Sequence, residues 1–496
     1  MRVTIASRRS DLARIQAYQV GKALQSAHPQ LEIKYSFHES LGDRNQHDPL
    51  WQMPEKGVFT QDFREGLLRH DFDLVVHSWK DLAIEEDPQT EIAATLPRAD
   101  ARDILLIRED RWPQIQSTGD VAILTSSPRR AYNLDSFLRV ALPAKVRTLN
   151  FVNVRGNVPT RIRKLFQSDV DGLIVAKAAI DRLLEAEQTE FAITQAEVRK
   201  ALTRSRWMVL PLSANPSAPA QGALAVEILR DRNDLKALLE PINSQETFEV
   251  VTRERAILAG YGGGCHQKIG VAVLRRPFGD VTFLRGLTDD AVDLESATLT
   301  SLRPASESVR SEELWPQNAS EGRLFISESV PAKQPAASRA LWVAKADALP
   351  DDCAIEPRQI VWTSGLQTWK RLAARGVWVN GSAESLGESE SPVIEALVDG
   401  KLEWLKLTHA QGFAGDLPTL ATYRLTPRNG AVDLRGKKHF FWKSGSSFEY
   451  ALSQNPWLKE MSHYCGPGNT QRILQRHGIK PIVFLNYGQW LKEMLA

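Results

Sequence analysis

The sequence predicts an α/β protein of several domains, and three observations support this prediction. The chain has 496 residues, about three times the roughly 150 residues of an average domain. Apolar residues make up 43% of it, which is enough for packed cores and excludes wholesale disorder. Strand and helix patterns alternate over the first half, as is typical of mainly parallel sheets with crossover helices.

The first 96 residues predict one such domain. Short apolar runs predict strands at Val3–Ala6, Leu31–Phe37 and Asp73–His77. Apolar residues at helical spacing predict helices at Leu12–Ala23 and Phe63–Leu68.

Residues 97–206 repeat the pattern and predict a second domain. We expect strands at 104–107, 121–124, 145–149 and 172–175, and helices at 129–140, 160–166 and 178–186. A further apolar run at 223–228 predicts another strand, so we expect the chain to return to the first domain at about residues 207–237.

The rest of the chain divides into a small domain, a linker and a second α/β module. A helical pattern at Glu246–Ala259 and strands from Ile269 onward predict a third domain at 238–303. Residues 304–338 are rich in Ser, Glu, Pro and Ala and predict a linker, with one strand at Leu324–Ile326. Strand patterns then resume, which predicts a separate α/β module at 339–496.

Charge and cysteine content narrow the function classes. The formal net charge of +2 argues against a general nucleic-acid binder, which is usually strongly basic. Three widely spaced cysteines fit neither a disulfide framework nor a metal knuckle, so we expect a reducing cytoplasm and no metal. No apolar run approaches a membrane span, and we expect a monomer that acts on a small molecule.

Arginines gather where predicted strands end. Ser7-Arg8-Arg9-Ser10, Thr125–Arg130 and Arg155-Gly156-Asn157 each follow a strand, the position that faces the ligand crevice of an open α/β sheet. Helix N-termini bind anions there, and arginine grips carboxylates with two parallel hydrogen bonds. Any one pair could be solvated, but several together favour a polycarboxylate or polyphosphate ligand.

Two other segments could carry chemistry. Lys80 and Asp81 follow the buried run Val75–His77, where Asp81 could stabilise a cation or simply cap a helix. Gly262-Gly263-Gly264 precedes Cys265, which could be a nucleophile, a covalent attachment point or an ordinary thiol. A phosphate-binding P-loop is excluded because no Lys-Ser/Thr pair follows these glycines.

Taken together, these segments resemble the hydroxymethylbilane synthase (porphobilinogen deaminase) family, in the same order from residue 3 to about residue 275. The matching pieces are Ser7–Ala13, Gly42-Asp43, Glu55–Thr60, Val75–Leu82, Thr125–Arg130, Asn153–Asn157, Ala220–Leu224, Glu254–Ala256 and Gly263–Cys265.

The resemblance implies two doubly wound domains like those of periplasmic binding proteins, with the active site in the cleft between them. A third domain would carry a dipyrromethane cofactor on Cys265, and Asp81 would be the catalytic carboxylate. Cofactor binding would involve Lys80, Ser127, Arg129, Arg130, Arg155 and Gln221, and substrate binding would involve Arg8, Ser10, Gln16, Lys56, Arg161 and Arg182.

The implied reaction belongs to tetrapyrrole (haem) biosynthesis. Four porphobilinogen molecules would each lose ammonia and condense onto the cofactor, and hydrolysis would release hydroxymethylbilane. Each porphobilinogen carries two carboxylates, which agrees with a cleft rich in arginine and lysine. The chain departs from the family at Gln61, Ala83, Leu124, Lys177, Ala179 and the long stretch 211–219, which bears on affinity and loop geometry.

The C-terminal module resembles uroporphyrinogen-III synthase more faintly. The matches are Leu417-Pro418, Tyr423-Arg424, Phe440–Ser446, Cys465–Thr470 and His477–Pro481. The resemblance implies a two-lobed cyclase acting on the linear tetrapyrrole, with Thr470 at a helix start that lines the cleft. Two alternatives stay open: a non-catalytic remnant in this module, and a solute-binding protein built on the first two domains, which would need neither Asp81 nor Cys265.

Overall fold

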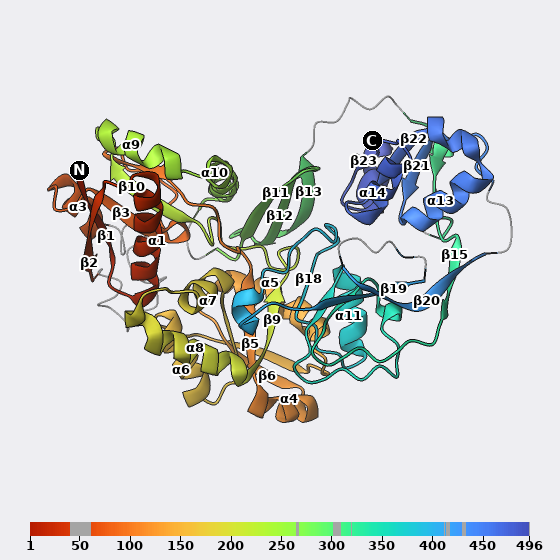
Figure 1. Cartoon of the computed structure of the whole chain (residues 1–496), viewed down its shortest axis with the longest axis horizontal. Coiled ribbons are helices and arrows are strands. Elements are labelled where there is room, and N and C mark those ends of the chain that lie inside the picture. The colour runs from red at the N-terminus through yellow and green to blue at the C-terminus, as the bar shows by residue number, and fades with distance from the viewer. Residues whose placement is uncertain are drawn as a thin grey trace.

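The fold is mixed α/β, as the sequence predicts (Figure 1). A computed structural model of the chain describes residues 1–39, 61–263, 267–300, 309–318, 320–410, 412, 417–428 and 433–495. These residues form two five-stranded sheets, one three-stranded sheet, one six-stranded sheet and one four-stranded sheet.

The first sheet has the strand order β2-β1-β3-β10-β4. Its strands are β1 (Arg2–Arg8), β2 (Glu32–His38), β3 (Leu74–Ser78), β4 (Thr90–Ala94) and β10 (Leu224–Leu229), accompanied by helices α1 (Asp11–Ala27) and α3 (Gln61–Leu68). Strands β1, β2 and β3 run parallel, whereas β10 is antiparallel to both β3 and β4.

The second sheet, β7-β6-β8-β5-β9, repeats this arrangement. Its strands are β5 (Asp103–Arg108), β6 (Asp120–Leu124), β7 (Thr148–Val152), β8 (Gly172–Ala176) and β9 (Ser205–Leu210). Its helices are α4 (Trp112–Thr118), α5 (Pro128–Ala141), α6 (Val158–Gln167), α7 (Lys177–Leu184) and α8 (Ala192–Thr203). Strand β5 is antiparallel to β8 and β9, so each sheet has fewer parallel pairs than the sequence predicts.

Two segments cross between these sheets, residues 95–102 and residues 211–223, and we call them the crossing segments. The predicted return at residue 207 is wrong, because β9 pairs with β5 along its whole length in the second sheet. The chain re-enters the first sheet only at β10. In each sheet, the strand that follows a crossing segment lies beside three parallel strands and runs antiparallel to its neighbour among them. These strands are β5 and β10.

Helix α9 (Asn233–Leu239) packs its Leu235 and Leu239 into the core of the first sheet. The third domain contains α10 (Gln245–Ala259) and a meander of β11 (Gly270–Arg276), β12 (Gly279–Leu287) and β13 (Asp293–Thr300), and its strands lie between the first sheet and the smaller C-terminal sheet in Figure 1. Ser244 caps α10 by accepting a hydrogen bond from the Thr247 amide, which explains why this helix starts where it does.

The C-terminal module has two lobes. The larger sheet, β15-β20-β19-β16-β17-β18, is formed by β15 (Phe325–Ser329), β16 (Ala340–Val343), β17 (Val361–Thr363), β18 (Gly381–Ser382), β19 (Trp404–His409) and β20 (Thr419–Pro427), with α11 (Leu366–Ala374) and α12 (Glu395–Val398). The smaller sheet, β14-β21-β22-β23, is formed by β14 (Leu314–Trp315), β21 (His439–Trp442), β22 (Ser462–Cys465) and β23 (Ile482–Val483), with α13 (Gly445–Gln454), α14 (Asn469–Arg476) and α15 (Tyr487–Met494).

The predicted linker is wrong over part of its length. Strand β14 pairs with β21 in the smaller lobe, and β15 pairs with β20 in the larger lobe, so residues 314–329 belong to the module. The strand predicted at Leu324–Ile326 is present as β15. Polar composition misled the prediction because β15 lies at the edge of its sheet, where its residues 326–329 are exposed.

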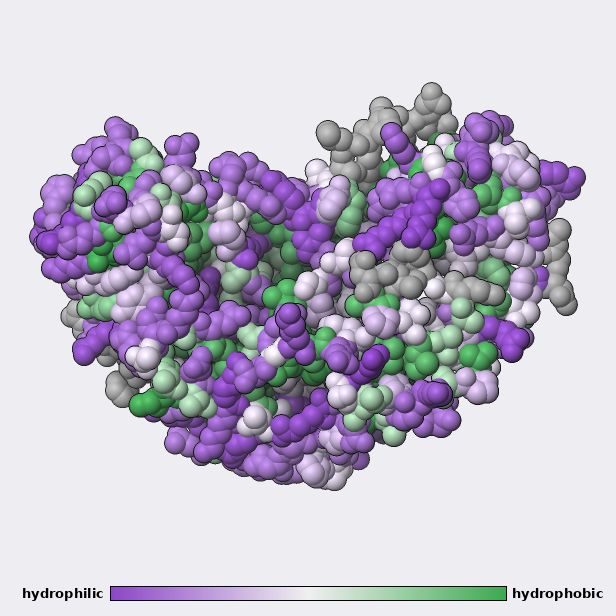
Figure 2. Space-filling model, in the orientation of Figure 1, coloured by the Kyte–Doolittle hydropathy of each residue, from purple (hydrophilic) through white to green (hydrophobic). Residues whose placement is uncertain are grey.

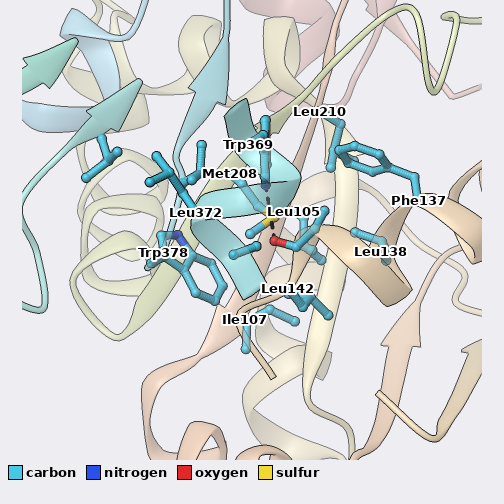
Figure 3. Packing of buried hydrophobic residues seen from close by; sticks show 14 of the residues in the cluster. Leu105, Ile107, Phe137, Leu138, Leu142, Met208, Leu210, Trp369, Leu372 and Trp378 are labelled. Atoms are coloured by element: carbon cyan, nitrogen blue, oxygen red, sulfur yellow. Dashed lines mark hydrogen bonds between the residues drawn. The ribbon is translucent and has the colours of Figure 1, made fainter. Parts of the chain in front are cut away.

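The module is also not separate, because it packs against the second sheet (Figure 3). Trp369 of α11 is fully buried beside Phe137, and its indole nitrogen donates a hydrogen bond to the Ala141 carbonyl at 3.1 Å. At the sheet edge, the Val209 amide donates to the Asn380 carbonyl at 2.8 Å, which covers part of β9. An exposed sheet edge favours aggregation, so this contact protects the second domain.

The outer face shown in Figure 2 is mostly hydrophilic, with small scattered hydrophobic patches. Among the helices that the structure describes, none is long and apolar enough to cross a membrane.

A buried carboxylate in β10, the strand next to β3, predicts acid sensitivity. Burial would raise the pKa of Glu227, but hydrogen bonds from His77, Thr90 and Arg64 outweigh burial and lower this pKa to about 2. The ionised carboxylate therefore stabilises the fold above the usual pKa of 4.5, and this stability is lost as pH falls toward 2. Thermal unfolding should show a loss on the order of 2 kcal/mol over this range. The variant Glu227→Gln, which cannot ionise, should be less stable at pH 7 and show a weaker dependence over the same range.

Candidate active site

The turn after β3 presents Lys80 and Asp81 in a short 3-10 helix, Trp79–Asp81. Trp79 is buried and meets Phe248 of α10 edge to face at 5.1 Å, which anchors the turn on the third domain. Asp81 is exposed, and the half-buried Lys80 donates from Nζ to Gln221 Oε1 at 3.2 Å. An anchored turn with an exposed carboxylate is suited to meet a ligand.

Three predicted residues of the first sheet lie near this turn or at the same sheet edge. Gln16 is buried and donates from Nε2 to Ser78 Oγ at 2.9 Å, directly before the turn. Arg8 ends β1 and Ser10 follows it, and β1 is parallel to β3, so both residues lie at the same edge, where they are half-exposed. The structure thus places Gln16 as a support for the turn, and Arg8 and Ser10 at the edge that a ligand would meet.

The second sheet contributes Arg155 and Arg161, both half-exposed. Arg161 lies in α6, whose start is capped by Asn157, and its Nε donates to the Gly156 carbonyl at 2.8 Å. Burial, together with the charges of Arg130 and Arg155, lowers the pKa of Arg161 to about 10, while Asp81 opposes this shift. Arg161 of the second sheet therefore lies within electrostatic range of Asp81, which follows β3 of the first sheet.

Positive charges in this cluster repel one another. Burial, opposed by Asp81 and Asp103 and reinforced by Arg130 and Arg129, lowers the pKa of Lys80 to about 8. Cationic side chains that lie this close together are stabilised by bound anions. The lysine and arginine donors of this cluster therefore fit a ligand with several carboxylates.

Arg129 and Arg130 both bind Asp103, a residue that the sequence analysis did not identify. Asp103 is fully buried and accepts hydrogen bonds from Arg130 Nη2 at 2.7 Å and from Arg129 Nη2 at 2.9 Å. Gln221 and Asn215 of the second crossing segment donate to the same carboxylate, each at 2.8 Å. These side chains thus bind the protein itself, and the cofactor-binding role expected for Arg129, Arg130 and Gln221 remains a prediction.

Ser127 and Arg182 also make protein contacts. Ser127 caps α5, its Oγ accepting from the Arg130 amide at 3.4 Å. Arg182 is buried, and its Nη2 donates to the Gly222 carbonyl of the second crossing segment at 2.8 Å. The structure therefore places Arg182 beside a crossing segment, and its predicted contact with substrate is untested.

Lys56 and Cys265 lie outside the described residues, but the chain leading to Cys265 is described. Gly263 has φ of 65°, and a Cβ atom there would lie 3.0 Å from Ile84 Cδ1, just after the Asp81 turn. Arg255 of α10 donates from Nη1 to the Leu82 carbonyl at 3.2 Å. The third domain therefore brings the start of the cysteine loop against the turn that carries Asp81.

Comparison with known proteins agrees with this arrangement. Residues 3–237 match the family model described as "Porphobilinogen deaminase, dipyromethane cofactor binding domain". Porphobilinogen deaminase of Clostridium novyi is 32% identical over 270 residues, which cover 54% of this chain and 83% of that protein. This chain belongs to the porphobilinogen deaminase family. The porphobilinogen deaminase of Acidothermus cellulolyticus is 36% identical over 309 residues, covering 58% of this chain and 85% of that relative.

Membership in the porphobilinogen deaminase family confirms the resemblance found in the first half of the sequence, and with it a transferase of tetrapyrrole biosynthesis that uses a dipyrromethane cofactor. The matched relatives correspond to a little over half of this chain. The further module is an addition to the part that these proteins share.

Proposed function

We propose that residues 1–303 form a hydroxymethylbilane synthase, which condenses four porphobilinogen molecules and then releases hydroxymethylbilane by hydrolysis. The observation that carries this proposal is the exposed Asp81 next to Lys80 on the first sheet, within electrostatic range of Arg161 on the second sheet. A cleft between two such sheets, as in periplasmic binding proteins, is the layout that the family resemblance implies.

The cofactor would be attached to Cys265. When bound, a dipyrromethane supplies the free pyrrole carbon to which the first substrate is joined. Lys80, Arg155 and Arg161 would pair with its acetate and propionate groups and with those of the growing chain. Arg8 and Ser10 would add donors from the edge of the first sheet, and Lys56 would bind substrate.

Asp81 would stabilise the substrate as ammonia leaves. Departure of ammonia from porphobilinogen puts positive charge on its pyrrole ring, and the exposed Asp81 carboxylate could face the ring N–H. Removing one such preorganised electrostatic contact typically costs about 2.7–4 kcal/mol of transition-state stabilisation. The anchored Trp79 keeps this carboxylate in place, so little reorganisation is required.

The purified full chain tests the proposal when it is given porphobilinogen. We expect release of ammonia in step with loss of porphobilinogen, and a linear tetrapyrrole as the product. Binding of porphobilinogen without its consumption would favour the solute-binding alternative and contradict an enzymatic role.

The two-lobed C-terminal module favours a second activity, closure of the linear product to uroporphyrinogen III. The chain enters the larger lobe through β15 and leaves it through the antiparallel partner β20, so two adjacent strands join the lobes. After β21, Ser444 caps α13, and after β22, α14 begins at Asn469 beside Thr470. The N-terminus of α14 has no side-chain cap, and helix N-termini favour anionic groups, which agrees with a polycarboxylate substrate.

An isomer assay separates a working cyclase from a non-catalytic remnant. The full chain is given porphobilinogen, and the products are oxidised and separated into isomers I and III. We expect mainly isomer III with the protein present. Linear product that is filtered away from the protein should close to isomer I and is the control. Isomer I alone in both samples would show that the module does not cyclise.

A further inference from the structure

One segment of the C-terminal module touches both crossing segments and the third domain. This segment, residues 382–393, begins in β18 and ends two residues before the start of α12, and we call it the strap. Glu384 of the strap accepts hydrogen bonds from the Leu212 amide at 2.9 Å and the Ser213 amide at 2.6 Å. These two amides start the second crossing segment.

The strap makes two further polar contacts with the deaminase half. Arg102, at the end of the first crossing segment, donates from Nη2 to the Pro392 carbonyl at 2.7 Å. Arg276 of β11 forms a two-pronged ion pair with Glu390 at 2.5 Å and 2.7 Å. Leu386 is buried among apolar residues of the third domain and Leu212. The strap is therefore fastened at three different places.

Carboxylates from three parts of the chain hold the crossing segments, and two of them, Asp103 and Glu254, are fully buried. Asp103 of the second sheet binds Gln221 and Asn215. Glu254 of α10 binds Arg98 of the first crossing segment through both carboxylate oxygens, at 2.7 Å and 2.9 Å, and accepts from the Ala220 amide. Glu384 is the counterpart from the module. Residues that join two lobes are where hinge motion is absorbed, so these carboxylates restrain a hinge.

The backbone of the strap is held in an unfavourable conformation. Glu384, Ser385 and the β-branched Val393 have φ of 53°, 64° and 51°, in the left-handed region that such residues seldom adopt. A conformation of this kind persists only when surrounding contacts hold it. Contacts with the second crossing segment at Glu384, and hydrogen bonds within the module such as that from the Ser385 amide to the Ser364 carbonyl at 2.7 Å, hold this conformation together.

The opposite side of the strap meets the smaller lobe of the module. A Cβ atom on Gly468, at the start of α14, would lie 2.8 Å from the Cα atom of Gly387. The strap thus lies between the smaller lobe and the crossing segments, where a change in the spacing of the lobes would be transmitted to it.

We propose that the strap is a brace through which the C-terminal module restrains the hinge of the deaminase half. Release of the strap loosens both crossing segments, and a change in the separation of the two C-terminal lobes alters the motion of the deaminase cleft. The coupling is reciprocal, as for any two linked equilibria. The regulatory meaning of this brace rests on the proposed deaminase function, but the mechanical coupling does not.

Hydrogen exchange of the full chain tests the brace. Glu384→Gln keeps the shape of the side chain and removes the charge that two amides share. We expect the backbone amides of residues 212–215, and those of the non-proline residues in 95–102, to exchange at least tenfold faster than in the unchanged chain. Glu403→Gln, the same change at an exposed glutamate of this module, is the control and should leave both segments unchanged.

A second variant tests the brace if Glu384→Gln does not fold. Glu390→Gln removes the partly exposed ion pair with Arg276 and should also speed exchange in 95–102, although by a smaller factor. Exchange that changes only at Leu212 and Ser213, or in neither crossing segment, would overturn the brace. Hydrogen exchange is measured without turnover. Absence of deaminase activity would therefore refute the proposed function, but it would not change the outcome of this test of the brace.

Discussion

Asp81→Asn should lower porphobilinogen consumption by about a hundredfold or more, because it removes one preorganised charge from the transition state. Asparagine has nearly the same shape, and Asp81 is exposed, so the fold should be retained. The rate of ammonia release at saturating porphobilinogen measures the loss, and thermal unfolding checks the fold.

The matched control for this variant is Glu86→Gln, which neutralises a largely exposed carboxylate five residues further along the chain. Its activity should match that of the unchanged chain. Turnover by Asp81→Asn within a few-fold of the unchanged chain would remove Asp81 from the role proposed for it.

Asp103→Asn should destabilise the fold by about 3–5 kcal/mol, the usual cost of leaving buried charges without their partner. Burial would raise the pKa of Asp103, but Arg130 and Arg129 outweigh burial and hold it well below its ordinary value. Asparagine can keep some hydrogen bonds but leaves two buried guanidinium groups without a counter-charge. Denaturant unfolding followed by tryptophan fluorescence measures the change.

Asp110→Asn is the control for this stability change, because Asp110 forms an exposed ion pair with Arg108 close to the other end of the same strand. Its effect should be below about 1 kcal/mol, as for other exposed ion pairs. Equal effects of the two variants would show that Asp103 is not the centre of the buried network.

Strand ends in the sequence identified three residues that the structure places at the expected edges of the two sheets. Arg8 ends β1, while Asp81 and Arg155 follow β3 and β7, and parallel strands end at one edge of a sheet. A prediction that relies on strand ends therefore works for these residues without knowledge of the fold.

Asp103 was missed for the same geometrical reason. It begins β5, and a residue at the start of a strand is expected at the opposite edge. Because β5 is antiparallel to β8, Asp103 pairs with Ala176 at the end of β8 and so reaches the site edge. The direction of β5 depends on the crossing between domains, which local sequence patterns do not reveal.

Local sequence patterns also did not predict that the C-terminal module packs against the second domain. Trp369 and Trp378 look like ordinary core residues of their own lobe, and both donate indole hydrogen bonds to carbonyls of the second domain. Strand β9 was missed because it is apolar on both faces and directly follows α8, so it lacks the alternation of a half-exposed strand. Its second face is explained by the module that covers it.

The mass of the purified full chain tests the central claim most directly. A deaminase of this family should carry two linked pyrroles, and peptide mapping should place the added mass on Cys265. Cys265→Ser should be isolated without this mass and should not consume porphobilinogen. Active protein in which Cys265 is unmodified would contradict the assignment of this chain as a dipyrromethane-dependent hydroxymethylbilane synthase.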